Sequence, residues 1–362
     1  MELDQIKPKK TEKLKGRGAT TNPDNRFSQY SSAHFDDGWN TLEEPAKSVA
    51  TVVLQERSKT IITSNQSPDV NFEFSINPYR GCEHGCIYCY ARPTHAYWDM
   101  SPGLDFETKI ITKPDAAKLL RKAICKPGYE CQAICIGANT DPYQPLEKEL
   151  LTTRALLEVL QEFRHPFSII TKSQLILRDI DILSEMTGDN LCSVAISVTT
   201  LDDELKRKME PRAASGKARL NTIRALSDAG VKVTMLVAPV IPFLNDSEIE
   251  DILQAGRDAG AVSASYIFLR LPLEVAGLFR DWLLEHYPEK AEHIMSLVQQ
   301  SRGGGDYRSG FGRRMSGEGV FAKMIADRFN VASKRLGFVG SDRFQLDTSQ
   351  FVRHGGQQLD LF

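Results

Sequence analysis

The strongest constraint on the fold is an alternation of short apolar runs with amphipathic segments between residues 72 and 287. The apolar runs are nearly continuous, as expected for parallel strands that are covered on both faces. Each run is followed by a segment with helical periodicity, so the pattern predicts six strand–helix units. The predicted strands are 72–76, 132–137, 167–171, 193–198, 232–237 and 265–269. The predicted helices are 115–124, 152–163, 177–186, 217–229, 246–259 and 275–286.

Three cysteines directly follow the first predicted strand. Cys82, Cys86 and Cys89 have the spacing C-x3-C-x2-C, with an aromatic residue just before the last cysteine. Three thiolates so close together can hold three irons of a [4Fe–4S] cluster and leave the fourth iron open to a cofactor or substrate. The position of the cysteines after a strand also indicates an active site, because the active sites of barrel folds lie at the carboxyl ends of the strands.

Other interpretations of the three cysteines stay open from the sequence. A zinc site would need a fourth ligand, which His84, His95 or Cys125 could supply. A disulfide or a set of unrelated core cysteines is a further alternative, although seven unevenly spaced cysteines do not resemble a secreted disulfide framework.

The run RGCEHGCIYCYAR resembles the signature of the radical S-adenosylmethionine (radical SAM) enzymes. The resemblance covers roughly residues 72–275 and implies two cofactors, a [4Fe–4S] cluster and S-adenosyl-L-methionine. It also implies the partial (β/α)6 TIM-type barrel of that family, because six strand–helix units are too few for a closed eight-unit barrel. In the family the position of Tyr88 lies against the adenine of the cofactor.

Polar residues at the ends of later strands are the other cofactor-binding candidates. The family usually binds the amino group of the cofactor with a Gly-Gly-Glu-like segment after strand two, where this chain instead has Asn139, Thr140 and Asp141. A cation or hydroxyl at the barrel mouth could bind the cofactor carboxylate or ribose. The candidates for this role are Lys172, Ser197 and Arg212, with Glu210 beside them, and Arg270 is a candidate for substrate contact.

The segments NPYRGC, NTDPYQPLE, SVTTLD and EPRAAS resemble the DNA repair photolyase-like branch, which is related to spore photoproduct lyase. In that lyase a cysteine in the strand-two loop returns a hydrogen atom to the substrate, and the aligned position here is near Ala138. Cys131 and Cys135 lie a few residues earlier and are the candidate hydrogen donors, provided that they face the barrel mouth.

The chain is divided into three regions by its composition. Residues 1–70 are predicted to form a basic, flexible arm and residues 71–287 the radical SAM core. Residues 288–362 are predicted to form a helical, Arg/Gly-rich extension. The formal net charge of −2 gives no global basic field. Neither a signal peptide nor a membrane span is expected, and an iron–sulfur cluster favours a reducing compartment, so we expect the cytoplasm.

The last five residues resemble the pentapeptide with which bacterial polymerases and repair proteins bind the DNA sliding clamp. They are Gln358, Leu359, Asp360, Leu361 and Phe362. The apolar side chains can fill a pocket while the Gln fixes the register.

The leading hypothesis is therefore a radical SAM enzyme that acts on DNA and takes electrons from a flavodoxin or ferredoxin. The alternatives are a radical SAM enzyme that modifies RNA and a non-enzymatic, metal-stabilised module that binds nucleic acid.

Overall fold

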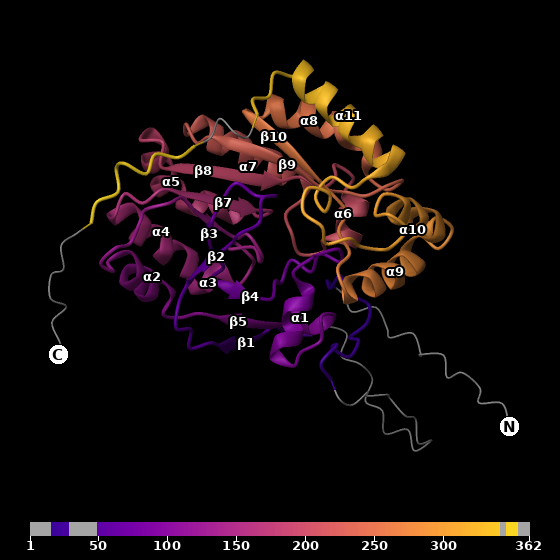
Figure 1. Ribbon diagram of the computed structural model, residues 1–362, viewed down its shortest axis with the longest axis horizontal. Coiled ribbons are helices and arrows are strands. Elements are labelled where there is room, and N and C mark those ends of the chain that lie inside the picture. Colours follow the sequence, from indigo (N-terminus) through magenta and orange to yellow (C-terminus); the bar gives the residue numbers. More distant parts are fainter. Residues whose placement is uncertain (1–15, 29–48, 341–344, 354–362) are drawn as a thin grey trace.

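A seven-stranded sheet lies at the centre of the molecule (Figure 1). The computed structural model describes residues 16–28, 49–340 and 345–353. In these residues every neighbouring pair of the sheet β2–β3–β6–β7–β8–β9–β10 is parallel, except β2 with β3. The strands are β2 (Ile62–Ser64), β3 (Phe74–Ile76), β6 (Ile134–Ile136), β7 (Phe167–Thr171), β8 (Cys192–Ser197), β9 (Val233–Val240) and β10 (Ser263–Phe268). The parallel strands and their crossover helices confirm the predicted partial barrel.

The two faces of the sheet carry different residues, because successive side chains along a strand point to opposite faces. One row across the sheet contains Ile76, Ile136 and Ile169, which are fully buried in the main apolar core. The adjacent row contains Ser75 and Cys135. Since Ser75 lines a cavity, this second row faces the inside of the barrel.

Helices cover the outer face of the sheet and make the crossovers between parallel strands. They are α2 (Ala116–Ile124), α4 (Thr152–Glu162), α5 (Ile180–Gly188), α7 (Gly216–Asp228), α8 (Ile249–Asp258) and, after β10, α9 (Glu274–His286). Shorter elements are η1 (Arg92–Trp98), α1 (Leu104–Thr108), α3 (Glu147–Leu150), η2 (Gln174–Asp179), α6 (Asp203–Met209) and η3 (Asp246–Glu248). The crossover helices match the predictions except at their ends: the segment predicted as helix 177–186 begins inside η2.

The region predicted as a flexible arm is ordered in its described parts. β1 (Val52–Gln55) pairs with β5 (Lys109–Thr112), which also pairs with β4 (Tyr79–Arg80), and these form a second, three-stranded sheet. β2 extends the edge of the main sheet, and residues 16–28 pack against the body of the protein. The rest of the predicted arm, residues 1–15 and 29–48, lies outside the described residues.

Glu107 holds the N-terminal segment against the loop that carries the cysteines. Its buried carboxylate forms an ion pair with Arg92 (2.5 Å) and accepts hydrogen bonds from the amides of Gly18 (2.9 Å) and Ala19 (2.8 Å). Arg92 is also fully buried and donates through Nε to the carbonyl of Cys86 (2.9 Å). The same buried ion pair therefore contacts both the N-terminal segment and the cysteine loop.

The C-terminal extension contains the predicted helices α10 (Ala291–Gln300) and α11 (Gly319–Arg335). Between them lies a bridging segment, residues 302–315, which joins the two edges of the open barrel. At one end Arg302 donates to the carbonyls of Phe268 (3.1 Å) and Leu269, at the end of β10. At the other end Arg314 pairs with Asp69, in the hairpin between β2 and β3.

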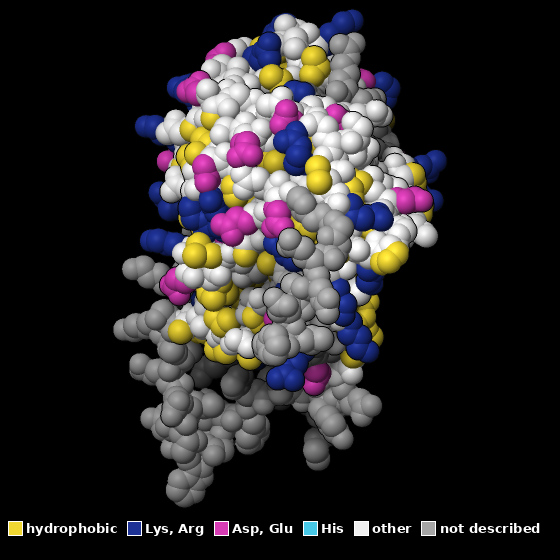
Figure 2. Space-filling view, turned by 90° about the vertical axis from the view of Figure 1, so that its left-hand side faces the viewer, with side chains coloured by type: hydrophobic (Ala, Val, Ile, Leu, Met, Phe, Trp, Pro, Cys, Tyr) yellow, Lys and Arg dark blue, Asp and Glu magenta, His cyan; other side chains and the backbone are white. Residues whose placement is uncertain are grey.

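Residues 345–353 run along the outside of the barrel. Phe351 stacks on Phe163, with ring centroids 6.5 Å apart, and the amide of Val352 bonds to the Phe163 carbonyl (3.0 Å). Figure 2 shows this side of the molecule, where cationic and anionic side chains are interspersed on the visible surface. None of the helices in the described parts of the chain is both long and apolar enough to span a bilayer.

Replacing Glu107 with Gln should strongly destabilise the protein, because the guanidinium of Arg92 would stay buried without a counter-charge. Loss of one partner from a buried ion pair costs about 3–5 kcal/mol. Urea unfolding followed by tryptophan fluorescence would measure the free energy of unfolding. The control Asp327→Asn removes the partner of Lys323 in an exposed ion pair (2.8 Å), and it should cost less than about 1 kcal/mol. Equal stability of Glu107→Gln and the parent would contradict the structural role of the pair.

Candidate active site

Two glycines shape the loop that carries the three cysteines. Gly81 and Gly85 have positive φ values of 79° and 67°, a conformation that favours glycine. A Cβ atom on Gly81 would lie 2.8 Å from the ring of His95, so a larger residue does not fit there. The amide of Cys82 donates to the carbonyl of Phe106 (2.9 Å), which fixes the start of the loop after β4.

The three thiols are enclosed by protein. Cys82 and Cys86 are buried, and Cys89 packs against the apolar clusters around both of them. Burial raises the pKa of all three thiols. Thiols in such surroundings ionise readily only when a metal centre binds them, since thiolates are the form that coordinates metal.

The three side chains fit a cluster better than a single ion. In the described ranges no group of three His, Cys, Asp or Glu side chains is arranged to hold one metal ion. In a [4Fe–4S] cluster each thiolate binds a different iron, so the sulfurs need not converge on one point. The residues that could supply the fourth ligand of a zinc site have other partners or are exposed. His84 faces Asp141 (3.3 Å), His95 Nε2 lies 3.0 Å from the Lys109 carbonyl, and Cys125 is exposed.

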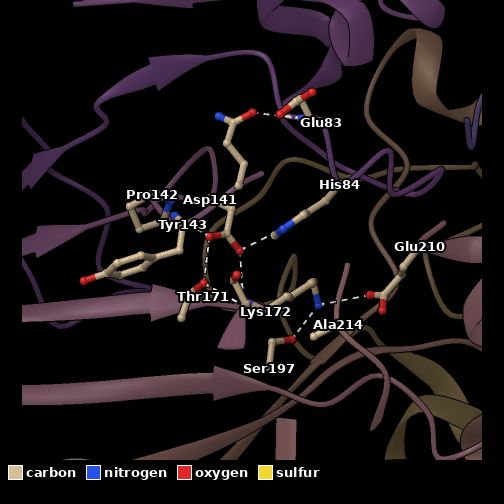
Figure 3. Close-up of polar contacts among 12 residues, drawn as sticks. Glu83, His84, Asp141, Pro142, Tyr143, Thr171, Lys172, Ser197, Glu210 and Ala214 are labelled. Atoms are coloured by element: carbon tan, nitrogen blue, oxygen red, sulfur yellow. Dashed lines mark hydrogen bonds and ion pairs between the residues drawn. The ribbon is translucent and has the colours of Figure 1, made fainter. Parts of the chain in front are cut away.

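Asp141 connects the cysteine loop to the sheet (Figure 3). Its Oδ1 accepts from the Thr171 hydroxyl (2.7 Å) and the Tyr143 amide (2.9 Å). Its Oδ2 accepts from the Lys172 amide (2.8 Å) and lies 3.3 Å from Nδ1 of His84. Burial would raise the pKa of Asp141, but the facing His84 and these hydrogen bonds hold it below its usual value. Both carboxylate oxygens are thus engaged within the protein.

Lys172 and Ser197 meet at the mouth of the barrel, as the predicted strand phase requires. Lys172 Nζ donates to the hydroxyls of Ser197 (2.6 Å) and Thr199 (3.1 Å) and to the carbonyl of Ala238 (3.1 Å). It also lies 3.3 Å from the carboxylate of Glu210. Figure 3 shows Lys172 between Ser197 and Glu210. The result is a small polar group that combines one ammonium with two hydroxyls.

Glu210 holds the aromatic residue of the cysteine motif in place. Its fully buried carboxylate accepts from the hydroxyl of Tyr88 and forms an ion pair with Arg219. Burial would raise the pKa of Glu210, but Arg219 and Lys172 outweigh this effect and lower it. The ammonium of Lys172 lies 5.8 Å from the centre of the Tyr88 ring. The positive charge of Lys172 partly offsets the rise in the pKa of Cys86 and Cys89 that burial causes. The polar group is therefore close enough to the cysteine loop to act on its charges.

Three other candidates lie nearby in different settings. The backbone amides of Asn139 (2.8 Å) and Thr140 (3.3 Å) bind the side-chain oxygen of Asn77, and the Thr140 hydroxyl donates to a β4 carbonyl (2.6 Å). Asn139 lines a cavity beside the cysteine loop. The guanidinium of Arg212 pairs with Glu83 (3.1 Å), within the cysteine loop.

The two candidate hydrogen donors lie in different places. Cys131 precedes β6, at the amino end of the sheet, so the structure does not bring it to the cysteine loop. Cys135 is buried within β6, where it lies beside Ser75 of β3 in the inward-facing row. Burial raises the pKa of Cys131 to about 11 and that of Cys135 to about 12, so both are neutral thiols.

The sequence analysis missed Thr199 and Arg219. Thr199 lies in the quoted segment SVTTLD, two residues after Ser197, and the strand phase could have identified it. Arg219 lies on α7, 22 residues from the Ser197 carbonyl that it binds, and no local signal in the sequence marks this contact. The Arg92–Glu107 ion pair was not predicted either, because nothing in the sequence distinguishes its two residues from ordinary surface charges.

Comparison with known proteins indicates the family of this chain. The family model of the radical SAM superfamily matches residues 76–255, which include the three cysteines, Asp141, Lys172 and Ser197. An uncharacterized protein of Mycobacterium tuberculosis is 36% identical over 231 residues, which cover 63% of this chain and 68% of that protein. The chain belongs to the radical SAM superfamily.

Other relatives of this radical SAM protein are more distant. An uncharacterized protein of Methanocaldococcus jannaschii is 27% identical over 250 residues, which cover 69% of this chain and 89% of that protein. Among solved structures, spore photoproduct lyase complexed with dinucleoside spore photoproduct is similar in fold. The TM-score is 0.56 at 17% identity, and the match covers 79% of this chain and 80% of the lyase. The family implies S-adenosylmethionine and an iron–sulfur cluster as cofactors.

Replacing Cys82, Cys86 or Cys89 with Ala should prevent the radical SAM protein from retaining its cluster. Anaerobically reconstituted parent protein should contain about four irons per chain, and each variant should lose most of this iron. Iron and acid-labile sulfide analysis would measure the content. Cys125→Ala is the matched control, because Cys125 is exposed at the end of α2. An unchanged iron content in any of the three variants would show that its thiol is not a ligand.

Proposed function

We propose that this protein is an enzyme that cleaves S-adenosylmethionine reductively and abstracts hydrogen from nucleic acid, specifically from a DNA lesion or base. The observation that carries the proposal is the position of the Lys172 polar group. Its ammonium lies 5.8 Å from the ring centre of Tyr88, which stands between Cys86 and Cys89, and a cavity of about 410 Å³ adjoins the same loop. This arrangement offers adjacent places for a cluster, its cofactor and a substrate.

Cys82, Cys86 and Cys89 would hold the cluster, and the Lys172 polar group would bind the cofactor. When bound, the cluster and S-adenosylmethionine together supply a 5′-deoxyadenosyl radical, which removes hydrogen from carbon. To bind the cofactor carboxylate, the ammonium of Lys172 would exchange a bond to a neighbouring hydroxyl or to the Ala238 carbonyl for one to the carboxylate. The hydroxyls of Ser197 and Thr199 can bond to a carboxylate or ribose. Arg212 remains a proposed second carboxylate contact, conditional on its release from Glu83.

Other residues position these groups. Asp141 fixes the backbone of Lys172 and the side chain of His84, so we assign it a positioning role in cofactor binding. Glu210 anchors Tyr88, which we propose to lie against adenine. Asn139 and Thr140 remain the proposed contacts for the cofactor amino group, because they directly precede Asp141 in the loop after β6.

Cys135 is the better of the two proposed hydrogen donors. Its thiol is neutral and lies in the inward-facing row with Ser75, which lines the cavity. A neutral S–H bond can give a hydrogen atom to a carbon radical, whereas a thiolate cannot. Cys131 precedes β6 at the amino end of the sheet, away from the cysteine loop that follows β4.

Two observations support nucleic acid as the substrate. The residues that line the cavity include Arg80, Lys113, Arg270 and Arg314 but no Asp or Glu among those described. In addition, a solved structure with the same fold is a lyase complexed with a dinucleoside photoproduct. Cationic walls suit a phosphate-bearing substrate. A flavodoxin or ferredoxin is the proposed electron donor, and the cytoplasm is the proposed compartment.

Reconstituted protein with reductant and S-adenosylmethionine should form 5′-deoxyadenosine faster with UV-irradiated DNA than with untreated DNA or none. Liquid chromatography would quantify the product under anaerobic conditions. Cofactor cleavage without a response to either DNA would contradict a DNA substrate and favour an RNA-modifying enzyme. An intact cluster without cleavage under any condition would contradict the catalytic proposal.

The same assay tests the cofactor site. Lys172→Met removes the ammonium that would bind the cofactor carboxylate, and the loss of one charge-assisted hydrogen bond should weaken binding by about tenfold or more. Lys323→Met is the matched control, because Lys323 is exposed on α11 and far along the chain from the site.

The C-terminal pentapeptide is proposed to recruit the enzyme to the sliding clamp. Gln358, Leu359, Asp360, Leu361 and Phe362 lie outside the described residues. The last described residues, 345–353, are held on the outer surface of the barrel by Phe351 and Val352. A tethered enzyme has a raised effective concentration near DNA without a strong DNA site of its own.

Deleting Leu361 and Phe362 should abolish retention of the protein on immobilised clamp, because both apolar anchors of the pentapeptide are lost. Surface plasmon resonance with purified clamp would measure the binding. Gln357→Ala, which lies directly before the pentapeptide, should bind like the parent. Undiminished binding of the deletion variant would exclude this mode of recruitment.

A further inference from the structure

The cavity beside the cysteine loop is enclosed by segments that are far apart in the sequence. Its lining includes residues of the hairpin between β2 and β3 and of the end of the bridging segment, which Arg314 and Asp69 join. Ser75 of β3 and Ala138 and Asn139 of the loop after β6 also line the cavity. Tyr90, which directly follows Cys89, also lines it. A volume of about 410 Å³ admits a nucleobase with its sugar but not a duplex.

Each arginine that lines this cavity lies over an exposed aromatic ring. Arg80 lies 5.3 Å from the ring centre of Trp98, Arg270 lies 4.7 Å from that of Tyr90, and Arg314 lies 5.0 Å from that of Phe311. Tyr90 and Trp98 are each 39% exposed, and Phe311 is 60% exposed. We call these three pairs the arginine–aromatic rim. Large aromatic faces at the edge of a cationic cavity are suitable platforms for unstacked bases.

Arg270 differs from the other two arginines because it lacks an anionic partner. Arg80 pairs with Glu56 (2.7 Å), and Arg314 pairs with Asp69. Within the described residues Arg270 contacts only neutral groups, among them the sulfur of Met315 (3.5 Å). Its Nε atom is buried without a hydrogen-bond partner. A half-buried guanidinium without a counter-charge beside a cavity can bind an anion there, and a phosphate oxygen has the matching charge and geometry.

A second cation that lines the cavity, Lys113, is also placed to bind an anion. Lys113 donates to the carbonyl of Asn77 (2.8 Å) and lines the same wall as Arg80. Burial, with the nearby charge of Arg80, lowers the pKa of Lys113 to about 8. An anionic ligand would raise the pKa of Lys113 again, because it attracts the charged form of the ammonium.

From these contacts we infer that the cavity and the arginine–aromatic rim form a binding site for unpaired DNA, with a backbone phosphate on Arg270 and flanking bases on Trp98 and Phe311. The inference rests on the proposed function and specifies its substrate class. In a duplex the faces of the bases are covered by their neighbours and cannot stack on the rim. A single strand or an extruded nucleotide exposes both the faces and the phosphates.

Fluorescence anisotropy with a fluorescein-labelled DNA strand of mixed sequence tests this site in the reconstituted protein, without S-adenosylmethionine or reductant. The single strand should bind at least about tenfold more tightly than the same strand in a blunt duplex. Trp98→Ala and Arg270→Gln should each weaken binding of the strand by about tenfold. Weakened binding at higher salt is also expected, because phosphates are neutralised.

Matched controls come from cation–aromatic pairs elsewhere on the molecule. Phe243 is 53% exposed and has Lys290 5.8 Å from its ring centre, while Arg257 lies 5.8 Å from the ring centre of Phe338. Neither pair lines the cavity, so Phe243→Ala and Arg257→Gln should bind DNA like the parent. Thermal midpoints and iron contents of all four variants would show whether each protein is folded.

Three results would overturn the inference: equal or tighter binding of the duplex, unchanged binding by folded Trp98→Ala and Arg270→Gln proteins, or tighter binding of an RNA strand of the same sequence. Because binding is measured without cofactor cleavage, its outcome is independent of the test of the proposed function. Stimulated formation of 5′-deoxyadenosine together with a preference for duplex would leave the proposed function intact and reject this site.

Discussion

The arrangement of the site depends on the contacts that the buried carboxylate of Asp141 makes. A buried carboxylate must be surrounded by donors, and this one finds them on three separate segments. His84 belongs to the cysteine loop, Tyr143 to the loop after β6, and Thr171 and Lys172 to the end of β7. The contacts of this one carboxylate therefore hold the cysteine loop against the end of the sheet. They also fix the backbone from which the side chain of Lys172 reaches the barrel mouth.

The parts of this protein that the sequence predicts are those with local periodicity. Each buried parallel strand is a short apolar run, and the strand phase correctly brings Lys172 and Ser197 together. The cysteine spacing likewise predicts one compact loop. Asp141 was predicted as a cofactor contact, but its oxygens are engaged by the protein. The sequence shows that a polar residue follows a strand, and only the fold shows how many donors converge on it.

The contacts of the N-terminal segment could not be predicted from the sequence for a related reason. Residues 16–28 are polar and rich in glycine and asparagine, which is typical of a flexible arm. Their order comes from long-range contacts made largely by backbone amides, such as those of Gly18 and Ala19 with Glu107. A Cβ atom on Gly18 would lie 1.8 Å from the carbonyl oxygen of Gly85, so the close approach depends on the absence of a side chain. Backbone contacts of this kind leave no periodic pattern in the sequence.

The position of the same segment has a consequence for how the chain matures during synthesis. Thr21 contacts Asp281 (3.3 Å) and Arg26 contacts Glu274 (3.1 Å), so its partners on α9 lie about 250 residues further along the chain. Residues 16–28 leave the ribosome before α9, so their contacts with α9 cannot form until α9 has emerged and packed. At typical elongation rates this interval lasts roughly 10–50 s. During that time the segment has its partner Glu107 but not its partners on α9, so the N-terminal part of the fold is completed only after the strands of the barrel have been synthesised.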